Sequence, residues 1–287
     1  MSNFKIWLSA ALLVAAGSAK AQITTPQPSP LATITQKIGL IEAKVEYSRP
    51  SVKGRKIFGD VVPFDQLWRT GANSSTKITF SDSVSFGGTK IAGGTYALYT
   101  KPGAKEWTVI LGKTATEQAW DYKEGTEAAK IVVPIYAMKE KIESFMIMFE
   151  NLERNQADLM LAWENTLACI PIKTNPDAKI MADIKKRVVD NNDNMQTAAN
   201  YYFDNNKDLK QALEWANKVV EKNPAYWNLH LKAKILAKMG NCNEAQAAAK
   251  QSLALAEKDE DGAYVTMNKN LIAACPMTAT PAKGKKK

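Results

Sequence analysis

The periodicity of apolar residues changes once along this chain, and that change limits the folds open to it. Between Ile38 and Ile172, short segments rich in β-branched and aromatic residues are separated by turn residues, the pattern of an antiparallel sandwich or barrel. After a polar, proline-containing stretch at 173–178, apolar residues recur at the spacing of amphipathic helices. We therefore expect a β-sandwich-like or barrel-like domain over 38–172, a linker over 173–178 and a helical domain over 179–275.

The first domain contains several segments in which apolar and polar residues alternate. These segments predict strands at 42–47, 76–81, 89–91, 95–100, 106–111, 130–136, 143–150, 157–163 and 166–172. The stretch from Ser51 to Asn73 does not follow this pattern, because Pro63 and three glycines interrupt it. A loop of that length inside a compact domain is usually functional or packed by its own side chains.

The second domain contains an internal repeat. Ala212 and Ala216 recur 33 residues later as Ala245 and Ala249. Small residues at these positions let the helices of a hairpin approach closely, and the pattern resembles the tetratricopeptide repeat, whose period is about 34 residues. With a last helix at 263–274 to cover the open face, we expect a short array of helical hairpins, a surface suited to a protein or peptide partner.

The three cysteines are Cys169, Cys242 and Cys275. Cys242 falls at the turn of the second predicted hairpin and Cys275 at the end of the last helix, so the helix order brings both to one end of the stack. A disulfide requires Cα atoms within about 7 Å. We expect a bridge between Cys242 and Cys275, which leaves Cys169 as a buried free thiol.

The N-terminus has the pattern of an export signal. Lys5 precedes an apolar run over 6–16, and Ala19-Lys20-Ala21 fits the small-x-small cleavage rule, so residues 1–21 are expected to be removed between Ala21 and Gln22. The apolar run is far shorter than the roughly 20 residues that cross a bilayer. We expect a periplasmic or secreted protein without a transmembrane anchor, with flexible segments at 22–37 and 276–287.

The net charge of +9 overstates the charge of the folded body. Six of these charges come from two lysines in the predicted signal and four in the basic tail, which leaves about +3. Binding to nucleic acid needs a dense basic face. We therefore expect no nucleic-acid partner.

Few residues offer catalytic chemistry. His230 is the only histidine and falls on a predicted helix, so a Ser-His-Asp or Cys-His mechanism in the β domain is not available in its usual form. Neither zinc-binding clusters nor nucleotide-binding glycine patterns are found, and we expect no metal and no cofactor. Glu150, Glu164 and Asp121 keep glycoside hydrolysis open, which needs two carboxylates about 5–9 Å apart.

The irregular segment offers the best candidate for binding. Guanidinium groups suit carboxylates and phosphates, and a neighbouring aromatic ring can stack on a sugar or peptide plane. The candidates for an anionic or glycan-like ligand are Arg49, Lys53, Arg55, Trp68, Arg69 and Asn73. In the alternative interpretation, these side chains bind loop carbonyls and nearby carboxylates and so hold a segment with few backbone partners of its own.

Several of these segments also carry a resemblance. The runs 47–59 and 63–73, Ala92–Tyr99, Trp107–Ile110 and Leu161–Thr166 are similar to the signature of domain of unknown function 2911. That family consists of exported bacterial proteins common in the Bacteroidetes. The resemblance covers 40–172 and implies a sandwich-like domain outside the cytoplasm, often followed by helical repeats, with no established activity. The chain departs from the family at Gln118–Ala128, where Asp121 follows Trp120.

Two classes of function follow from these observations. The first is a non-enzymatic binding or scaffold protein of the periplasm. The second is a hydrolase of envelope polysaccharide or peptide, in which carboxylates act with Arg69 as the electrostatic partner.

Overall fold

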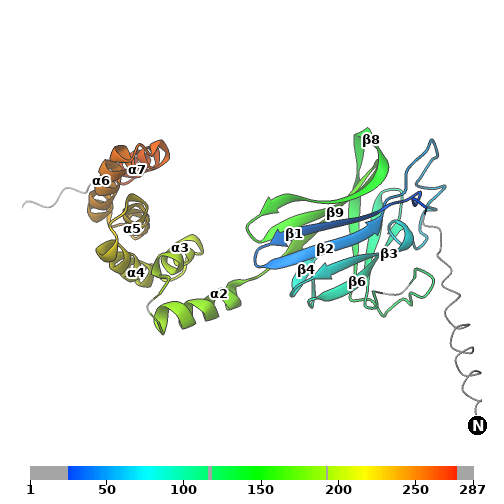
Figure 1. The fold of residues 1–287 in the computed structure, drawn as a ribbon, viewed down its shortest axis with the longest axis horizontal. Coiled ribbons are helices and arrows are strands. Elements are labelled where there is room, and N and C mark those ends of the chain that lie inside the picture. The colour runs from blue at the N-terminus through cyan, green and yellow to red at the C-terminus, as the bar shows by residue number, and fades with distance from the viewer. Residues whose placement is uncertain (1–24, 116–117, 192, 277–287) are drawn as a thin grey trace, which may run out of the picture. The chain divides into compact units, whose positions relative to one another are not determined.

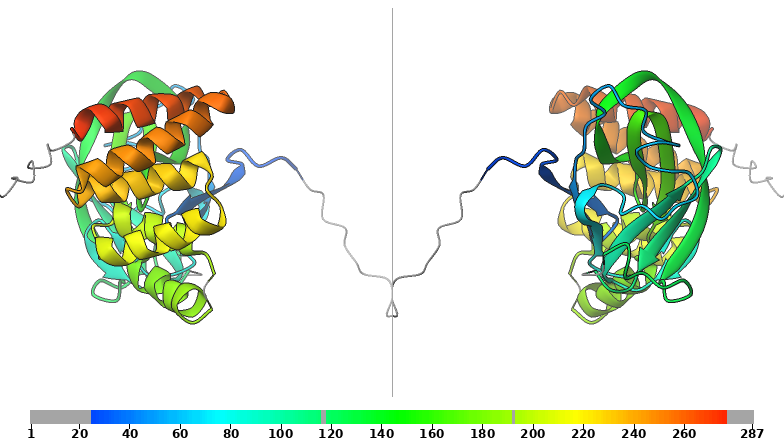
Figure 2. Two further views of the ribbon diagram at one scale, coloured as in Figure 1. Left: turned by 90° about the vertical axis from the view of Figure 1, so that its left-hand side faces the viewer. Right: turned by 90° about the vertical axis from the view of Figure 1, so that its right-hand side faces the viewer.

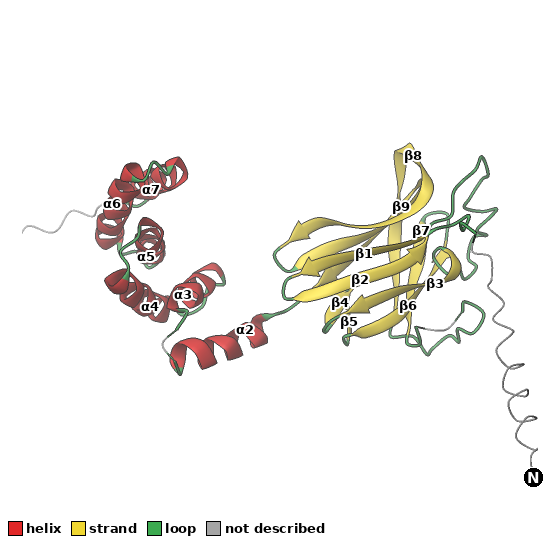
Figure 3. Ribbon diagram, in the orientation of Figure 1, coloured by secondary structure: helices red, strands yellow, loops and turns green. Residues whose placement is uncertain are grey.

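The computed structural model describes residues 25–115, 118–191 and 193–276, which form two compact units divided between Pro176 and Asp177 (Figure 1). An antiparallel sheet is followed by helices, so the predicted fold class is confirmed (Figure 3). The predicted signal peptide, its cleavage site at Ala21 and Gln22, and residues 277–287 of the predicted tail lie outside the described residues.

The β unit is one sheet with the strand order β1-β2-β3-β6-β7-β8-β9-β4-β5. The strands are β1 (Leu31–Ile38), β2 (Ile41–Ser48), β3 (Ala72–Phe80), β4 (Val84–Phe86), β5 (Thr89–Ile91), β6 (Gly94–Pro102), β7 (Glu106–Gly112), β8 (Ala129–Glu153) and β9 (Gln156–Lys173). Strand β8 pairs with β7 through residues 129–134 and with β9 through 135–153. Because β8 changes partner along its length, the sheet curls around one apolar core to which every strand contributes.

The two longest strands correct part of the prediction. We expected breaks inside 130–150 and 157–172, but β8 and β9 each run through as one strand. The pairing between them shifts register between Ala137 and Ile142, where exposed polar residues lie, and Glu164 adopts a left-handed φ of 54°. Such irregularities bend a strand without ending it.

Strand β1 is a second correction, because residues 22–37 were expected to be flexible. Leu31–Ile38 pairs in full register with β2, from Leu31 opposite Ser48 to Ile38 opposite Ile41. The two strands are joined by a two-residue turn that begins at Gly39, whose φ is +60°. Ala32 and Ile34 pack against the core on one face of β1, so the alternation that predicts a strand continues on the N-terminal side of Ile38.

The helical unit consists of consecutive helices, each packed on the next from α3 to α7 (Figure 2). They are α2 (Asp177–Ile184), a π-helical stretch η1 (Lys185–Val189), α3 (Met195–Asp204), α4 (Leu209–Lys222), α5 (Tyr226–Lys238), α6 (Cys242–Lys258) and α7 (Gly262–Ala274). The four repeated alanines of α4 and α6 are all buried, as close helix approach requires. The tetratricopeptide resemblance itself stays a prediction.

Cys242 and Cys275, the two cysteines that we expected to pair, form a disulfide with a Cα–Cα distance of 5.2 Å. Cys169 is a free thiol on β9, but it is half-buried rather than fully buried. Burial and the neighbouring Asp158 carboxylate raise the pKa of Cys169 to about 11. The thiol is therefore protonated at neutral pH.

His230 lies inside the helical unit, where its Nδ1 is 2.8 Å from Oδ1 of Asn268. The amide nitrogen of Asn268 donates in turn to the hydroxyl of Ser252 and to the carbonyl of Tyr264. Burial lowers the pKa of His230. The imidazole is thus a packed, neutral member of a hydrogen-bonded network between α5, α6 and α7.

Candidate functional site

The predicted arginines of the irregular segment bind backbone carbonyls. The bonds are from Arg49 Nε to Phe145 O (3.0 Å), from Arg55 to Ser51 O (2.7 Å) and Val52 O (3.0 Å), and from Arg69 Nη1 to Asn73 O (2.6 Å). A carbonyl that has no partner in a strand ladder or helix needs such a donor when it is removed from water. For Arg49 and Arg55, these contacts favour the structural interpretation over the binding one.

The other predicted candidates also have internal roles. Asn73 donates its amide protons to Ser29 O (3.1 Å) and to Ser48 Oγ (3.2 Å). Lys53 takes part through its backbone N–H, which donates to Glu143 Oε1 at 2.8 Å. The indole N–H of Trp68 donates to Gly71 O at 3.0 Å.

Trp68 also belongs to an aromatic cluster that packs the irregular segment against the core. Its ring stacks on Trp163 with a centroid distance of 5.8 Å and an interplanar angle of 16°. Phe58, from the same segment, contacts Trp107 and Trp163. The segment covers the end of the β unit that faces the viewer on the right of Figure 2. Long ordered loops can be stabilised by such packing of their own side chains. Because one face of the Trp68 ring is stacked on Trp163, that face cannot stack on a ligand.

The carboxylates considered for hydrolysis are engaged in separate places. Glu164 Oε2 accepts from the Ile57 N–H at 3.3 Å, and its Oε1 lies 3.9 Å from Lys141 Nζ. Glu150 lies opposite Asp158 in the β8–β9 ladder. Asp121 Oδ2 accepts from the Gln118 N–H at 3.1 Å in the connection between β7 and β8. The three carboxylates thus lie in three different parts of the β unit.

In the connection from β7 to β8, the described residues 118–128 pack on the outer face of the sheet through Ala119 and Tyr122. Tyr122 contacts Tyr99 of β6 with a ring centroid distance of 5.7 Å, in a small apolar cluster that includes Ile110. The hydroxyl of Tyr122 donates to Glu127 Oε2 at 3.0 Å. Burial and the Glu127 carboxylate raise the pKa of Tyr122 to about 12, so the phenol keeps its proton and this bond.

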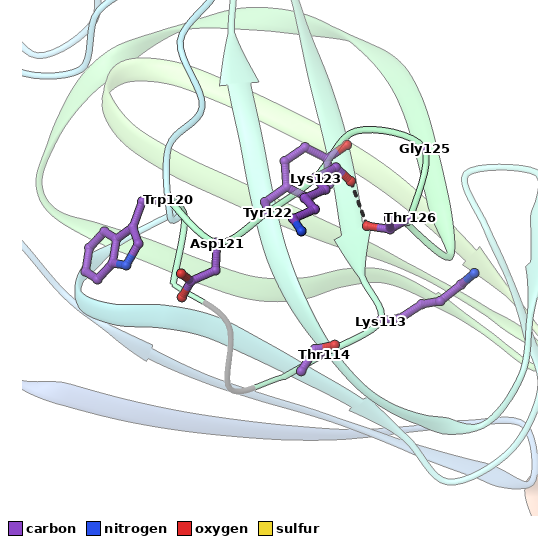
Figure 4. A pocket seen from close by; sticks show the side chains of 8 residues that line it. All are labelled: Lys113, Thr114, Trp120, Asp121, Tyr122, Lys123, Gly125 and Thr126. Carbon is purple, nitrogen blue, oxygen red and sulfur yellow. Dashed lines mark hydrogen bonds between the residues drawn. The ribbon is translucent and has the colours of Figure 1, made fainter.

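This connection forms a hollow of about 850 Å³ (Figure 4). Trp120 and Lys113 lie at opposite sides of it in that view, with Tyr122 and Lys123 between them. The Trp120 side chain is 71% exposed, and the guanidinium carbon of Arg69 lies 5.8 Å from its ring centroid. The lining residues are Lys113, Thr114, Trp120, Asp121, Tyr122, Lys123, Gly125 and Thr126.

A second hollow of about 440 Å³ shares Lys113 with the first. Lys90, Tyr96 and Ala128 are among the residues that line it. The two hollows therefore adjoin at Lys113.

Around the first hollow, the carboxylates have hydrogen-bond or ion-pair partners, whereas two of the lysines lack an ion pair within the described part of the chain. The carboxylate of Glu127 accepts from the Gly125 N–H at 2.7 Å, and Glu124 pairs with Lys130. Hydrogen bonds from the backbone lower the pKa of Glu127, and the hydrogen bond from Lys130 lowers that of Glu124. Among the described residues, by contrast, the ammonium groups of Lys113 and Lys123 have no ion-pair partner. The hollow therefore offers an exposed indole and unpaired cations.

Among the lining residues, only Asp121 is a predicted catalytic residue, and Arg69, which lies beside the hollow near Trp120, is a predicted binding residue. Trp120, Lys113 and Lys123 were missed as binding candidates, although Trp120 falls where the chain departs from the family pattern. One feature of the sequence indicates an exposed aromatic residue here. Trp120 lies in a mainly polar stretch between two predicted strands.

The described part of the chain lacks two other features. Within it, no group of three or more His, Cys, Asp or Glu side chains is placed to hold a metal ion. None of the helices there is long and apolar enough to span a membrane.

The β unit matches a known protein family. A family model described as "Protein of unknown function (DUF2911)" matches residues 29–172, half of the chain. The match begins before β1 and ends in β9, so β1 is part of the matched domain. No curated protein and no solved structure matches the chain.

Proposed function

This chain belongs to the DUF2911 family of proteins of unknown function, and we propose that it is an exported binding protein whose β unit takes an acidic saccharide at the hollow beside Trp120. The helical unit, in this proposal, contacts a protein or peptide partner. The family description names no activity, so the proposal is argued from the geometry of this chain.

The observation that carries the proposal is the exposed indole of Trp120 next to cations. A large aromatic side chain in water loses the free energy that burial would provide, and the amphipathic indole suits a ligand with one apolar face and polar edges. Arg69 holds its guanidinium near the ring, while Lys113 and Lys123 can pair with an anionic group. A sugar ring that carries a carboxylate has both properties.

Export is supported by two independent features. The first is the N-terminal pattern of a basic residue, an apolar run and a small-x-small site. The second is the disulfide between Cys242 and Cys275, a bond that persists in oxidising compartments and is rare in the cytosol. A periplasmic or secreted location also brings the protein to envelope polysaccharides.

The test is isothermal titration of the protein with a uronic-acid oligosaccharide and with a neutral oligosaccharide of the same linkage and length. We expect binding of the acidic ligand only. Trp120→Ala and the double variant Lys113→Gln/Lys123→Gln should each weaken it about tenfold, equivalent to about 1.4 kcal/mol. Trp227→Ala is the matched control, because Trp227 is 40% exposed in the helical unit.

Three results would overturn the proposal: no heat with the acidic ligand, equal affinity for the neutral one, or unchanged affinity of Trp120→Ala. The same samples distinguish the hydrolase alternative. New reducing ends that appear with the wild-type protein and disappear with Glu164→Gln would support that alternative instead.

A further inference from the structure

The helical unit contains a hollow of its own, of about 310 Å³. It lies where the start of α3, the end of α4 and the start of α5 meet. Its lining residues are Asp193, Asn194, Met195, Gln196, Thr197, Lys218, Val219, Lys222, Asn223 and Asn228. All of them belong to the helical unit, so this hollow is independent of the one beside Trp120.

Asn228 gives this hollow an unsatisfied acceptor. Its side chain is only 2% exposed, and its Oδ1 has no hydrogen-bond partner. The other end of the amide, Nδ2, donates to Asn223 O at 3.0 Å, which fixes the orientation of the group. Turning the amide over would place two carbonyl oxygens together. A buried acceptor left unpaired is costly, so Oδ1 points to a donor that a ligand would bring.

The start of α3 favours an anion, whereas Asn228 Oδ1 needs a hydrogen-bond donor. Asn194 precedes the helix with a left-handed φ of 55° and makes no capping bond with its side chain. Met195, Gln196 and Thr197 form the first turn, where backbone N–H groups have no partner inside the helix and the helix dipole favours an anion. The first turn carries no acidic residue.

The charged side chains around the hollow agree with this preference. Lys222 comes from the last turn of α4, and Lys218 lies one turn before it and also pairs with Glu214 at 2.9 Å. Asp193 is the acidic lining residue, and both of its oxygens accept from Asn194 at 2.7 Å. An anion in the hollow would thus meet a helix start and Lys222, while the carboxylate of Asp193 is already hydrogen-bonded.

We propose that this hollow binds a carboxylate whose neighbouring atom carries an N–H donor, the chemistry of an acylated amino acid or of a peptide's carboxyl terminus. The carboxylate is held by the first turn of α3 and Lys222, and the N–H donates to Asn228 Oδ1. A volume of about 310 Å³ admits one or two residues. The site deepens the proposed partner-binding role of the helical unit, which rests on the proposed function above.

The experiment uses the full-length oxidised protein and four probes: acetyl-alanine, acetyl-trialanine, the carboxamide of acetyl-trialanine, and propionate. Both acetylated acids should bind, while the carboxamide and propionate should bind at least about tenfold more weakly, because each lacks one of the two groups. Tighter binding of acetyl-trialanine would identify a chain terminus as the source. Equal binding of the two acids would identify a free acylated amino acid.

Variants locate the site. Lys222→Gln should weaken acetyl-alanine binding several-fold, and Lys250→Gln, an exposed lysine of α6 away from the hollow, should leave it unchanged. Asn228→Ala should weaken it as well, but it also removes the bond to Asn223, so Lys222→Gln and the propionate comparison remain decisive if that variant fails to fold. Unchanged binding by Lys222→Gln, equal binding of the carboxamide, equal binding of propionate, or no binding of either acid would overturn the proposal. None of these results depends on whether saccharide binds beside Trp120.

Discussion

Reduction of the Cys242–Cys275 disulfide should destabilise the helical unit by about 4 kcal/mol. The two cysteines are separated by 33 residues in sequence. For a loop of that length, the chain-entropy relation gives about 12.5 cal/mol/K of lost entropy in the unfolded state, or about 3.7 kcal/mol at 25 °C. A typical single domain is stable by only about 5–15 kcal/mol, so a loss of this size changes the unfolding midpoint strongly.

The loss should be concentrated at α7. This helix is held by an apolar cluster that includes Leu271 and Ile272, and by Gln246, whose amide donates to the carbonyls of Ile272 and Cys275. Without the bridge, noncovalent contacts must retain the terminal helix: these, and the hydrogen bonds of Asn268 to His230 and Ser252. Urea unfolding followed by circular dichroism at 222 nm, with oxidised and reduced protein, measures the difference. Amide exchange should show α7 losing protection first.

The control is Cys169→Ala, which removes the third cysteine and leaves the bridge intact. Its stability should fall on reduction by the same amount as that of the wild-type protein. Equal urea midpoints for oxidised and reduced wild-type protein would refute the reasoning. If reduction no longer lowered the stability of Cys169→Ala, the bridge would have to involve Cys169 instead.

Three further predictions concern single side chains. Burial lowers the pKa of His230, so the folded protein binds fewer protons than the unfolded chain, and the stability of the helical unit should fall as the pH drops below about 6.5. Thermal melts at about pH 5 to 8 test this, and His230→Gln should show a weaker dependence on pH; parallel profiles would contradict it. Trp68→Ala should cost the β unit about 3–5 kcal/mol because its ring packs in the core. Trp120→Ala should cost under about 0.5 kcal/mol, because Trp120 is exposed. Urea unfolding measures both losses, and equal losses for the two variants would contradict the assignment of Trp68 to the core and Trp120 to the surface. Cys169, with a pKa of about 11, should react slowly with iodoacetamide at about pH 8 in the folded protein and quickly in urea, as mass spectrometry would show. Equal rates would contradict the effect of burial.

Much of the fold could be predicted because periodicity is a local property. Side chains alternate along a strand and repeat about every 3.6 residues along a helix, so the change near residue 172 separates the two units without any knowledge of contacts. The same argument places the last helix, α7, and the position of Cys242 at a hairpin turn then brings Cys242 and Cys275 together. Strand β1 follows the same rule, because Ala32 and Ile34 alternate with exposed residues, and the prediction of a flexible segment there is wrong.

The continuity of β8 and β9 and the character of the candidate site could not be predicted in this way. Exposed polar residues near Ala137 indicate a break, yet a register shift against β9 lets the strand continue. Trp120 becomes a candidate binding residue only because its connection folds back over β6, with Tyr122 packed on Tyr99. The residues around Tyr99 and Tyr122 in the sequence do not indicate that these two rings are in contact.

By itself, the sequence determined where strands give way to helices, which cysteines can meet, and that cations gather in one irregular stretch. Only the tertiary structure decided what those cations bind. The guanidinium of Arg49 reaches a carbonyl 96 residues away, at Phe145, while Arg69 approaches the exposed ring of Trp120. Local geometry sets a period, but a hydrogen-bond partner depends on which distant backbone groups folding has removed from water.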